Sequence, residues 1–292
     1  MKKDFISIRD LNKKEVEELF SLTARLKHTR PKHEKPLAEK VIALVFEKPS
    51  LRTRVTFEAG IFELGGSVIY LSPQDIGLGK RESVKDVAQN LSQWVAGIVA
   101  RVFAHQTIEE LANYATIPVI NALSDYEHPC QALADLFTIY ERLGTFKNLK
   151  FVYIGDGNNV CRSLMLLAGI CELEMWVATP KGYEPQIPNT KHRILTDPMK
   201  AIKDADIVYT DVWASMGQEA EKEKRLKLFS PFQVNKELMG YAKPGCLIMH
   251  CLPAHRGEEI TAEVIDSPNS IVLEQAANRL HTQKALIMKL KV

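Results

Sequence analysis

Two arginines and two hydroxyl side chains lie close together in the segment Ser50–Arg54. The segment follows an apolar run, residues 41–46, that is typical of a strand, and it begins a stretch whose pattern predicts a helix. Free N–H groups and the positive end of the helix dipole favour an anion at a helix start. Guanidinium groups suit phosphate oxygens and Ser50 can cap the helix, so the segment predicts a phosphate site. A capped surface helix with solvated arginines is the alternative.

Further side chains that could do chemistry also follow apolar, strand-like runs. These residues are Arg101, His128 with Gln131, Asn159, Asp211 and Cys251. Ligands of open α/β sheets bind at the carboxyl ends of the strands, so we expect these side chains to serve one ligand-binding region. Each has an ordinary structural alternative: a solvated strand-end arginine, a helix-capping histidine, a turn-forming asparagine or a buried cysteine.

The types of these residues indicate polar chemistry at a carbonyl group. A histidine such as His128 can donate to a carbonyl oxygen and stabilise developing negative charge, as Arg101 can. A thiol near arginines has a lowered pKa, so Cys251 could bind or deprotonate an amine. Asp211 precedes a small loop with Ser215 and Met216, which could close over a ligand.

A nicotinamide site is not favoured by the glycine-containing segment 155–160. The dinucleotide motif needs a third glycine where this chain has Val160, and the acidic residue expected after the next strand is missing. Asn158 and Asn159 are better suited to bind a small polar ligand, with turn formation as the alternative.

The composition is that of an ordinary globular protein. The 292 residues are 46% hydrophobic and 25% charged, with a net charge of +2. This charge implies no broad field for nucleic acid or membrane, so an anion must be bound by a local cluster. The five cysteines form no CxxC pair, which predicts neither a disulfide framework nor a zinc site and favours a reducing cytoplasm. We expect no signal peptide and no membrane span.

Strand-like and helix-like runs alternate along the chain, which predicts an α/β protein with parallel sheets covered by helices on both faces. The alternation stops at residues 144–148 and then restarts. We therefore expect two doubly wound domains joined by a long helix, with boundaries at 1–143 and 144–273. Residues 274–292 are expected to form a helix that returns to the first domain. The charge-dense segment 221–227 is interpreted as a solvated face or loop.

Four motifs together resemble the aspartate/ornithine carbamoyltransferase family, nearly end to end. They are Phe46–Arg54, His128–Gln131, Asp211 with Ser215–Gly217, and His250–Ala254. The first two resemble elements common to all carbamoyltransferases. The last two resemble elements that separate the ornithine enzymes from the aspartate enzymes.

The resemblance implies transfer of a carbamoyl group from carbamoyl phosphate to the side-chain amine of L-ornithine, giving L-citrulline and phosphate. It implies a cytoplasmic homotrimer or a multiple of it, with no metal or redox cofactor. Arg101, His128, Asp211 and Cys251 would be catalytic. The residues implied for carbamoyl phosphate are Ser50, Leu51, Arg52, Thr53, Arg101, His128, Gln131, Cys251, Leu252 and Arg279. Those implied for ornithine are Asn159, Asp211, Ser215 and Met216.

The chain departs from the family pattern at two positions. Leu51 stands where a threonine is usual, so only its backbone N–H could serve the phosphate. Gly77 stands where many ornithine enzymes have a glutamine that reaches a neighbouring subunit's substrate. Two alternatives stay open: a putrescine carbamoyltransferase, and a non-catalytic carbamoyl-phosphate-binding regulator on the same fold.

Overall fold

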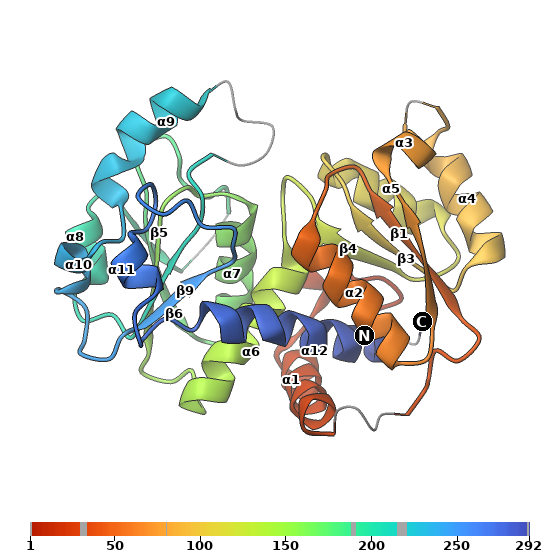
Figure 1. Cartoon of the computed structure of the whole chain (residues 1–292), viewed down its shortest axis with the longest axis horizontal. Coiled ribbons are helices and arrows are strands. Elements are labelled where there is room, and N and C mark those ends of the chain that lie inside the picture. The colour runs from red at the N-terminus through yellow and green to blue at the C-terminus, as the bar shows by residue number, and fades with distance from the viewer. Residues whose placement is uncertain (1, 30–33, 80, 188–190, 215–220, 291) are drawn as a thin grey trace. The chain divides into compact units, whose positions relative to one another are not determined.

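A computed structural model describes residues 2–29, 34–79, 81–187, 191–214, 221–290 and 292 (Figure 1). The chain divides into two compact units, one formed by Met1–Phe137 with Ala277–Val292 and the other by Thr138–Ala276. The chain passes between the units within two helices, α6 (Pro129–Leu143) and α12 (Val272–Leu290). The two-domain α/β class expected from the alternating pattern is confirmed.

The first unit contains a parallel sheet with the strand order β2-β1-β3-β4 in the described residues. Its strands are β1 (Val41–Phe46), β2 (Ser67–Leu71), β3 (Gly97–Arg101) and β4 (Val119–Leu123). The helices and the 3-10 turn before α6 are η1 (Ile8–Asp10), α1 (Lys13–His28), α2 (Leu51–Glu63), α3 (Pro73–Ile76), α4 (Val84–Trp94) and α5 (His105–Tyr114). The two central strands, β1 and β3, are buried along nearly their whole length, which explains their continuous apolar runs.

The helices α4 and α5 cover one face of this sheet. Alternate residues of the central strands, among them Val45 and Ile98, form a core there with Val87, Leu91 and Ile108 of the two helices. Such alternation follows from the two-residue period of a strand, which sends successive side chains to opposite faces. On the other face, α2 lies in front of the sheet in Figure 1.

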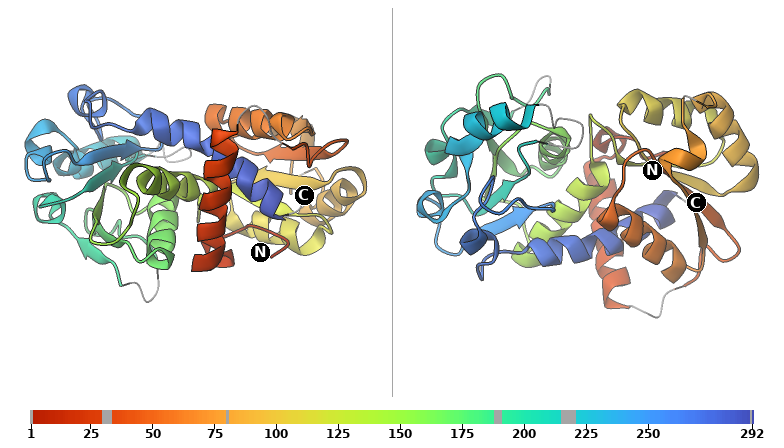
Figure 2. Two further views of the ribbon diagram at one scale, coloured as in Figure 1. Left: turned by 90° about the horizontal axis from the view of Figure 1, so that it is seen from below. Right: turned by 45° about the horizontal axis from the view of Figure 1, so that its top comes forward.

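The C-terminal part of α12 belongs to the first unit, as the sequence predicts. It lies against α1, where Lys27 Nζ donates to Asn278 Oδ1 at 2.9 Å and Lys289 pairs with Glu18 at 2.6 Å (Figure 2). It also lies against α2, since a Cβ atom at Gly60 would meet the Lys284 side chain at 3.1 Å. These contacts fix the part of α12 that carries Arg279.

The second unit contains a parallel sheet with the order β7-β6-β5-β8-β9 in the described residues. Its strands are β5 (Lys150–Ile154), β6 (Glu174–Ala178), β7 (Arg193–Leu195), β8 (Ile207–Thr210) and β9 (Leu247–His250). Its other elements are α7 (Asn159–Ile170), α8 (Pro198–Ile202), α9 (Lys222–Phe229), η3 (Ser230–Phe232), α10 (Lys236–Met239) and α11 (Ala262–Ile265). The apolar side chains of β5, β8 and β9 pack on one face with those of α8, α10 and α11.

Most side chains of residues 221–227 are exposed, as the interpretation of this segment as a solvated face expects, but Arg225 is an exception. Most of the segment lies in α9, and Arg225 is only 6% exposed. The helix is polar on most sides, and it is held by the buried contacts of Arg225 and Phe229 rather than by a wide apolar stripe.

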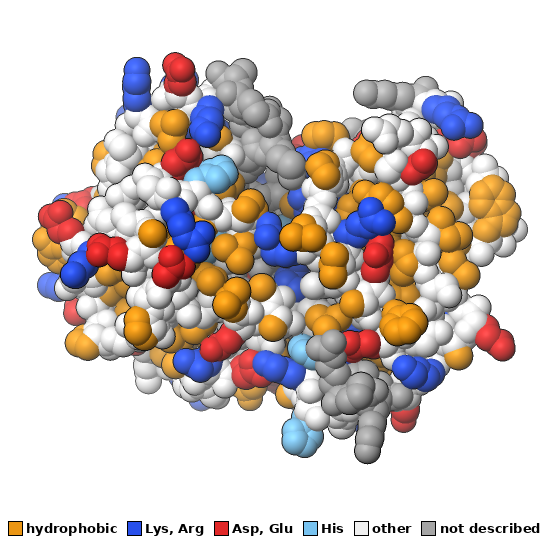
Figure 3. Space-filling model, viewed as in Figure 1, with side chains coloured by type: hydrophobic (Ala, Val, Ile, Leu, Met, Phe, Trp, Pro, Cys, Tyr) orange, Lys and Arg blue, Asp and Glu red, His pale blue; other side chains and the backbone are white. Residues whose placement is uncertain are grey.

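Charges of both signs are interspersed on the face of the molecule in Figure 3. This distribution agrees with the small net charge of +2. Among the helices of the described residues, none is both long enough and apolar enough to cross a bilayer.

Candidate active site

The start of α2 has the geometry expected of an anion-binding helix terminus. Ser50 is the N-cap residue, and its Oγ accepts a hydrogen bond from the N–H of Thr53 at 3.2 Å. Leu51 is 73% exposed, so its side chain leaves the backbone at the first turn open to solvent. The first turn of α2 carries no acidic residue, and the dipole and N–H groups of this terminus therefore favour a bound anion.

Arg279 links the start of α2 to the start of α6. Its guanidinium donates to Thr53 Oγ1 at 3.2 Å and also to Gln131 Oε1. Gln131 in turn donates from Nε2 to Asp135 Oδ1 at 2.7 Å, which fixes the orientation of its amide. Arg279 is only 2% exposed. Three residues that sequence resemblance assigns to one substrate are thus brought together by hydrogen bonds.

His128 lies at the start of α6, where its carbonyl accepts from the N–H groups of Gln131 and Ala132. Its side chain is buried beside three cationic groups, and burial is the largest effect on its ionisation. Burial, together with the positive charges of Arg279, Arg101 and Arg52, holds the pKa of His128 well below its ordinary value. The imidazole is therefore neutral at neutral pH and can donate a hydrogen bond without carrying charge.

Arg101 is buried, with 7% of its surface exposed, and is not the solvated strand-end arginine of the alternative interpretation. It ends β3, a strand with neighbours on both sides. The pairing of β3 with β4 shifts by one residue between Ala100 and Arg101. Such bulges reorient side chains at the ends of strands. Arg101 is close enough to His128 to depress its pKa.

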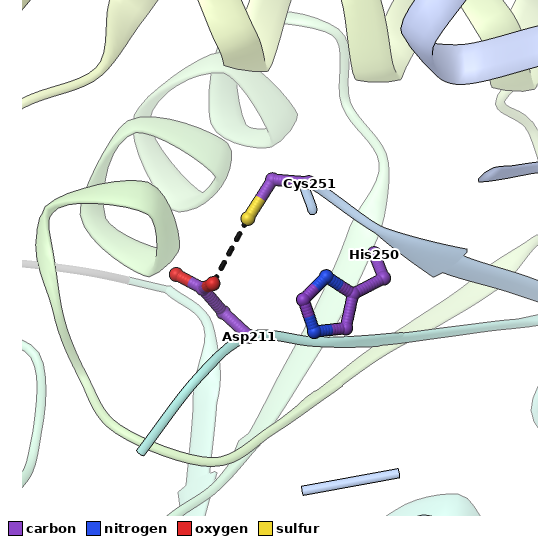
Figure 4. A group of neighbouring side chains, drawn as sticks. All are labelled: Asp211, His250 and Cys251. Carbon is purple, nitrogen blue, oxygen red and sulfur yellow. Dashed lines mark hydrogen bonds between the residues drawn. The ribbon is translucent and has the colours of Figure 1, made fainter. Parts of the chain in front are cut away.

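In the second unit, Asp211 and Cys251 follow neighbouring strands. Thr210 of β8 pairs with His250 of β9, so the next residue of each strand lies at the same sheet edge. The Cys251 thiol donates to Asp211 Oδ1 at 2.9 Å (Figure 4). Asp211 is 6% exposed, whereas Cys251 is half-buried. The pair places a thiol and a carboxylate where an amine could accept and donate hydrogen bonds.

Asn158 is a further contact of Asp211, and sequence reasoning assigned it no firm role. Its Nδ2 donates to Asp211 Oδ2 at 2.7 Å, while its Oδ1 caps α7 by accepting from the N–H of Cys161 at 3.0 Å. Asn159, the asparagine predicted to bind ornithine, lies one residue later at the first position of α7. The cap position of Asn158 was detectable as an asparagine before an apolar helical pattern.

A buried ion pair in the second unit was also missed. Arg225 donates to Asp156 Oδ2 at 2.8 Å and to the carbonyl of Trp213 at 2.9 Å. Burial raises the pKa of Asp156, and the Arg225 charge opposes this effect. The pair connects Asp156, the second residue after β5, with Trp213, two residues before Ser215. The predicted ligands Ser215 and Met216 themselves lie outside the described residues.

Gly77, one of the departures from the family pattern, ends α3 in the left-handed region with φ 51°. A Cβ atom there would approach Arg81 Cβ at 3.0 Å. A residue with a side chain would be strained at this position, which explains why glycine is found.

Among the residues that the structure describes, two groups of side chains offer metal-ligand atoms within 4.8 Å of one another: Asp211, His250 and Cys251, and His255, Glu258 and Glu259. In the first group, both ring nitrogens of His250 already have hydrogen-bond partners, the N–H of Leu252 at 2.8 Å and Glu259 Oε1 at 3.1 Å. Metal ligation by His250 would break one of these contacts.

Comparison with family models matches both units. Residues 3–141 match the carbamoyl-P binding domain of the aspartate/ornithine carbamoyltransferases, and residues 147–290 match their Asp/Orn binding domain.

Individual relatives agree over nearly the whole chain. An ornithine carbamoyltransferase of Methanosarcina acetivorans is 53% identical, with 99% of each chain covered. An anabolic ornithine carbamoyltransferase of Pyrococcus furiosus is 51% identical over 98% of this chain and 95% of its own. The solved ornithine carbamoyltransferase structure from P. furiosus superposes with a TM-score of 0.94 at 50% identity, covering 97% of this chain and 95% of that one. The structure from Thermus thermophilus has a TM-score of 0.93 at 46% identity and is covered completely, as is this chain.

Proposed function

Since this chain belongs to the aspartate/ornithine carbamoyltransferase family, we propose that it transfers the carbamoyl group of carbamoyl phosphate to the side-chain amine of L-ornithine. The products are L-citrulline and inorganic phosphate. The observation that carries this proposal is the set of three arginines around a buried, neutral His128, because it suits a phosphorylated carbonyl compound. The names of the relatives, all ornithine carbamoyltransferases, support ornithine as the acceptor.

The first unit binds carbamoyl phosphate in this proposal. The start of α2 receives the phosphate on Ser50, Arg52, Thr53 and the Leu51 N–H, where the dipole and the guanidinium favour negative charge. The carbamoyl group is bound by four further residues of this unit: Arg101, His128, Gln131 and Arg279. Gln131 and Arg279 are held by their mutual hydrogen bond, so they need little reorganisation when the substrate binds.

The second unit binds ornithine in this proposal. Asn159, Ser215 and Met216 hold its amino-acid end, together with Asp211. Cys251 meets the side-chain amine, and the Leu252 carbonyl contacts the carbamoyl group. The ordinary pKa of such an amine is about 10. It must lose a proton before it attacks, and Asp211 and Cys251 are placed to accept or organise that proton.

The reaction forms a C–N bond, breaks a C–O bond and moves one proton from nitrogen to oxygen. The neutral amine nitrogen attacks the carbamoyl carbon, and the carbonyl oxygen becomes negative in the tetrahedral intermediate. The His128 N–H and the Arg101 guanidinium stabilise this charge by preorganised hydrogen bonds. The C–O bond to phosphate then breaks, and the phosphate leaves with its electron pair and finally takes the proton from nitrogen. Each charge-assisted hydrogen bond contributes roughly 1.5–3 kcal/mol.

We also propose a homotrimer, or a multiple of it, in a cytoplasm that keeps thiols reduced. Several large apolar side chains of the first unit are exposed, among them Val55, Phe62, Ile69 and Trp94, and their burial between subunits would favour association. All five cysteines are free, which supports a reducing compartment. Light scattering coupled to size exclusion tests the oligomer: a mass of about three chains, or a multiple, is expected, and a monomer would contradict it.

The experiment that tests the activity compares acceptors. The purified protein is incubated with carbamoyl phosphate and either ornithine, putrescine or aspartate, and the carbamoylated product and phosphate are measured. Citrulline formation with ornithine as the preferred acceptor is expected. Turnover with putrescine but not with ornithine would instead identify the chain as a putrescine carbamoyltransferase. Calorimetric binding of carbamoyl phosphate without any turnover would favour the non-catalytic regulator.

A further inference from the structure

A buried histidine and a buried glutamate lie behind the segment that carries Cys251 and Leu252. His250, the last residue of β9, is 1% exposed, and Glu259 is fully buried. The two side chains meet at 3.1 Å between Nε2 and Oε1. Figure 4 shows the His250 ring beside the Asp211–Cys251 pair, with the drawn hydrogen bond running between the thiol and the carboxylate. The ring is therefore close to the reacting groups, but its own hydrogen bonds are made elsewhere.

The partners of the ring determine where its proton lies. Nδ1 accepts a hydrogen bond from the N–H of Leu252 at 2.8 Å. An acceptor nitrogen carries no proton, so the proton is on Nε2 and is donated to Glu259. A neutral imidazole with this tautomer satisfies both contacts at once, and the other tautomer satisfies neither.

Glu259 is itself fixed to the same segment. Its Oε1 also accepts from the N–H of His255 at 2.6 Å. Three hydrogen bonds therefore connect the two ends of the segment 250–255. The Leu252 N–H donates to the imidazole, the imidazole donates to the Glu259 carboxylate, and the carboxylate also accepts from the His255 N–H. The backbone at His250 is anchored separately, because its N–H donates to Gln275 Oε1 at 3.1 Å.

The segment needs such support because of its backbone conformation. Leu252 has φ 57°, in the left-handed region that residues with a side chain rarely adopt. Conformations of this kind persist when surrounding contacts impose them, and they cluster at functional sites. The imidazole contact is made at the N–H of this very residue. Losing it would let Leu252 relax, and the neighbouring thiol and the Leu252 carbonyl would move with it.

We propose that His250 and Glu259 are positioning residues that hold the Cys251 thiol and the Leu252 carbonyl in place for carbamoyl transfer. The effect on kcat that this inference predicts rests on the proposed function. Neither residue touches the substrates in the proposal; both act through the backbone of Leu252.

Two substitutions of His250 separate its two contacts. His250→Asn places an amide oxygen near the position of Nδ1, so it keeps an acceptor for the Leu252 N–H and loses Glu259. His250→Gln places its amide near the position of Nε2, so it keeps Glu259 and loses the Leu252 acceptor. We expect kcat for citrulline formation to fall roughly tenfold or more further in His250→Gln than in His250→Asn, as for a lost buried hydrogen bond. The affinity for inorganic phosphate, measured by calorimetry, should stay within about twofold of the wild type in both.

A second readout does not need turnover. The rate of Cys251 alkylation by iodoacetamide is followed by peptide mass spectrometry, which separates it from the other cysteines. The Cys251 thiol is half-buried and held by its hydrogen bond to Asp211, so its release in His250→Gln should raise the rate at least about threefold, with little change in His250→Asn. If the wild type made no citrulline, the proposed function would fail, but the labelling would still test the positioning.

Equal losses of kcat in both His250 variants, with equal labelling rates, would overturn the proposal. Glu259→Gln serves as a milder variant, because its amide oxygen can still accept from the imidazole and only the charge is lost. It should fold and show a kcat between those of the wild type and His250→Gln. Wild-type kcat together with a wild-type labelling rate in Glu259→Gln would remove Glu259 from the proposed pair.

Discussion

The Cys251 thiol donates a hydrogen bond to the Asp211 carboxylate at 2.9 Å, and the two residues follow paired positions of β9 and β8. A parallel sheet brings the carboxyl ends of neighbouring strands to one edge, so two residues 40 positions apart in sequence become direct partners. Asp211 receives a second donor from Asn158 Nδ2 at 2.7 Å. The carboxylate is thus held by contacts on both of its oxygens.

Replacing Asp211 should therefore damage the ornithine side of the reaction. Asp211→Asn removes the negative charge, and we expect kcat/KM for ornithine to fall roughly ten- to a hundredfold, as for loss of a charge-assisted hydrogen bond. The KM for carbamoyl phosphate should change much less. Initial rates with each substrate varied in turn measure this difference.

Cys251→Ser tests the role of the thiol, and Cys171→Ser is its matched control. Cys171 is the C-cap of α7, at the opposite end of that helix from Asn158 and Asn159, and it is half-buried like Cys251. Cys251→Ser should lower kcat while Cys171→Ser leaves it unchanged.

For the preceding prediction, equal kinetics for Asp211→Asn and the wild type would show that Asp211 does not bind the acceptor.

Much of the fold could be predicted because local patterns and tertiary structure agree. The apolar run 41–46 coincides with β1, since a buried parallel strand needs continuous apolar residues. Short elements were missed. The strand β7 has only three residues and α8 only five, too few for a periodic signal.

The polar partners of the site residues were harder to predict than the residues themselves. A strand end indicates where Asp211 and His250 lie, but not that Asn158 and Glu259 meet them. Arg225 was hidden because its segment is rich in charge, and only the fold shows that Asp156 compensates its burial. Such pairings join residues far apart in sequence, which a single sequence does not reveal.

Arg279 should be sensitive even to a conservative change. A lysine keeps the charge but cannot donate to Thr53 Oγ1 and Gln131 Oε1 from one planar group. We expect Arg279→Lys to lower kcat/KM for carbamoyl phosphate roughly ten- to a hundredfold. Lys289→Met is the control on the same helix, because its ion pair with Glu18 is partly exposed and such pairs contribute about 0–1 kcal/mol. Similar kinetics for the two variants would contradict the assignment of Arg279.

The buried His128 should make the protein less stable at mildly acidic pH. Its pKa is well below the ordinary value in the folded chain because of burial and three nearby arginines, and it is about 6.5 in an unfolded chain. Below pH 6.5 the unfolded chain binds more protons, so the free energy of unfolding falls as the pH falls. The slope is at most about 1.4 kcal/mol per pH unit for this group.

His128→Gln removes this titration while keeping a polar amide. Thermal unfolding midpoints are measured for both proteins between about pH 7.5 and about pH 5.0, a window that includes the ordinary pKa of about 6.5. The unfolding midpoint temperature of the wild type should fall more over this pH range than that of the variant. Parallel curves would show that His128 titrates alike in the folded and unfolded chains.

Gly157 should tolerate no side chain, because a neighbouring segment of the second unit passes directly over it. A Cβ atom there would lie 2.3 Å from the backbone nitrogen of Pro185 and 2.5 Å from the carbonyl oxygen of Tyr183. Backbone atoms cannot swing aside as a flexible side chain can, so Gly157→Ala should force the segment away and destabilise the unit by about 1–3 kcal/mol, as overpacking does. Gly169→Ala is the matched control, since its Cβ atom would meet only the His192 side chain at 3.6 Å. Within α7 that alanine should stabilise the helix by up to about 1 kcal/mol. Denaturant unfolding of both variants should therefore shift the midpoint in opposite directions, and a Gly157→Ala midpoint at or above the wild-type value would refute the close approach.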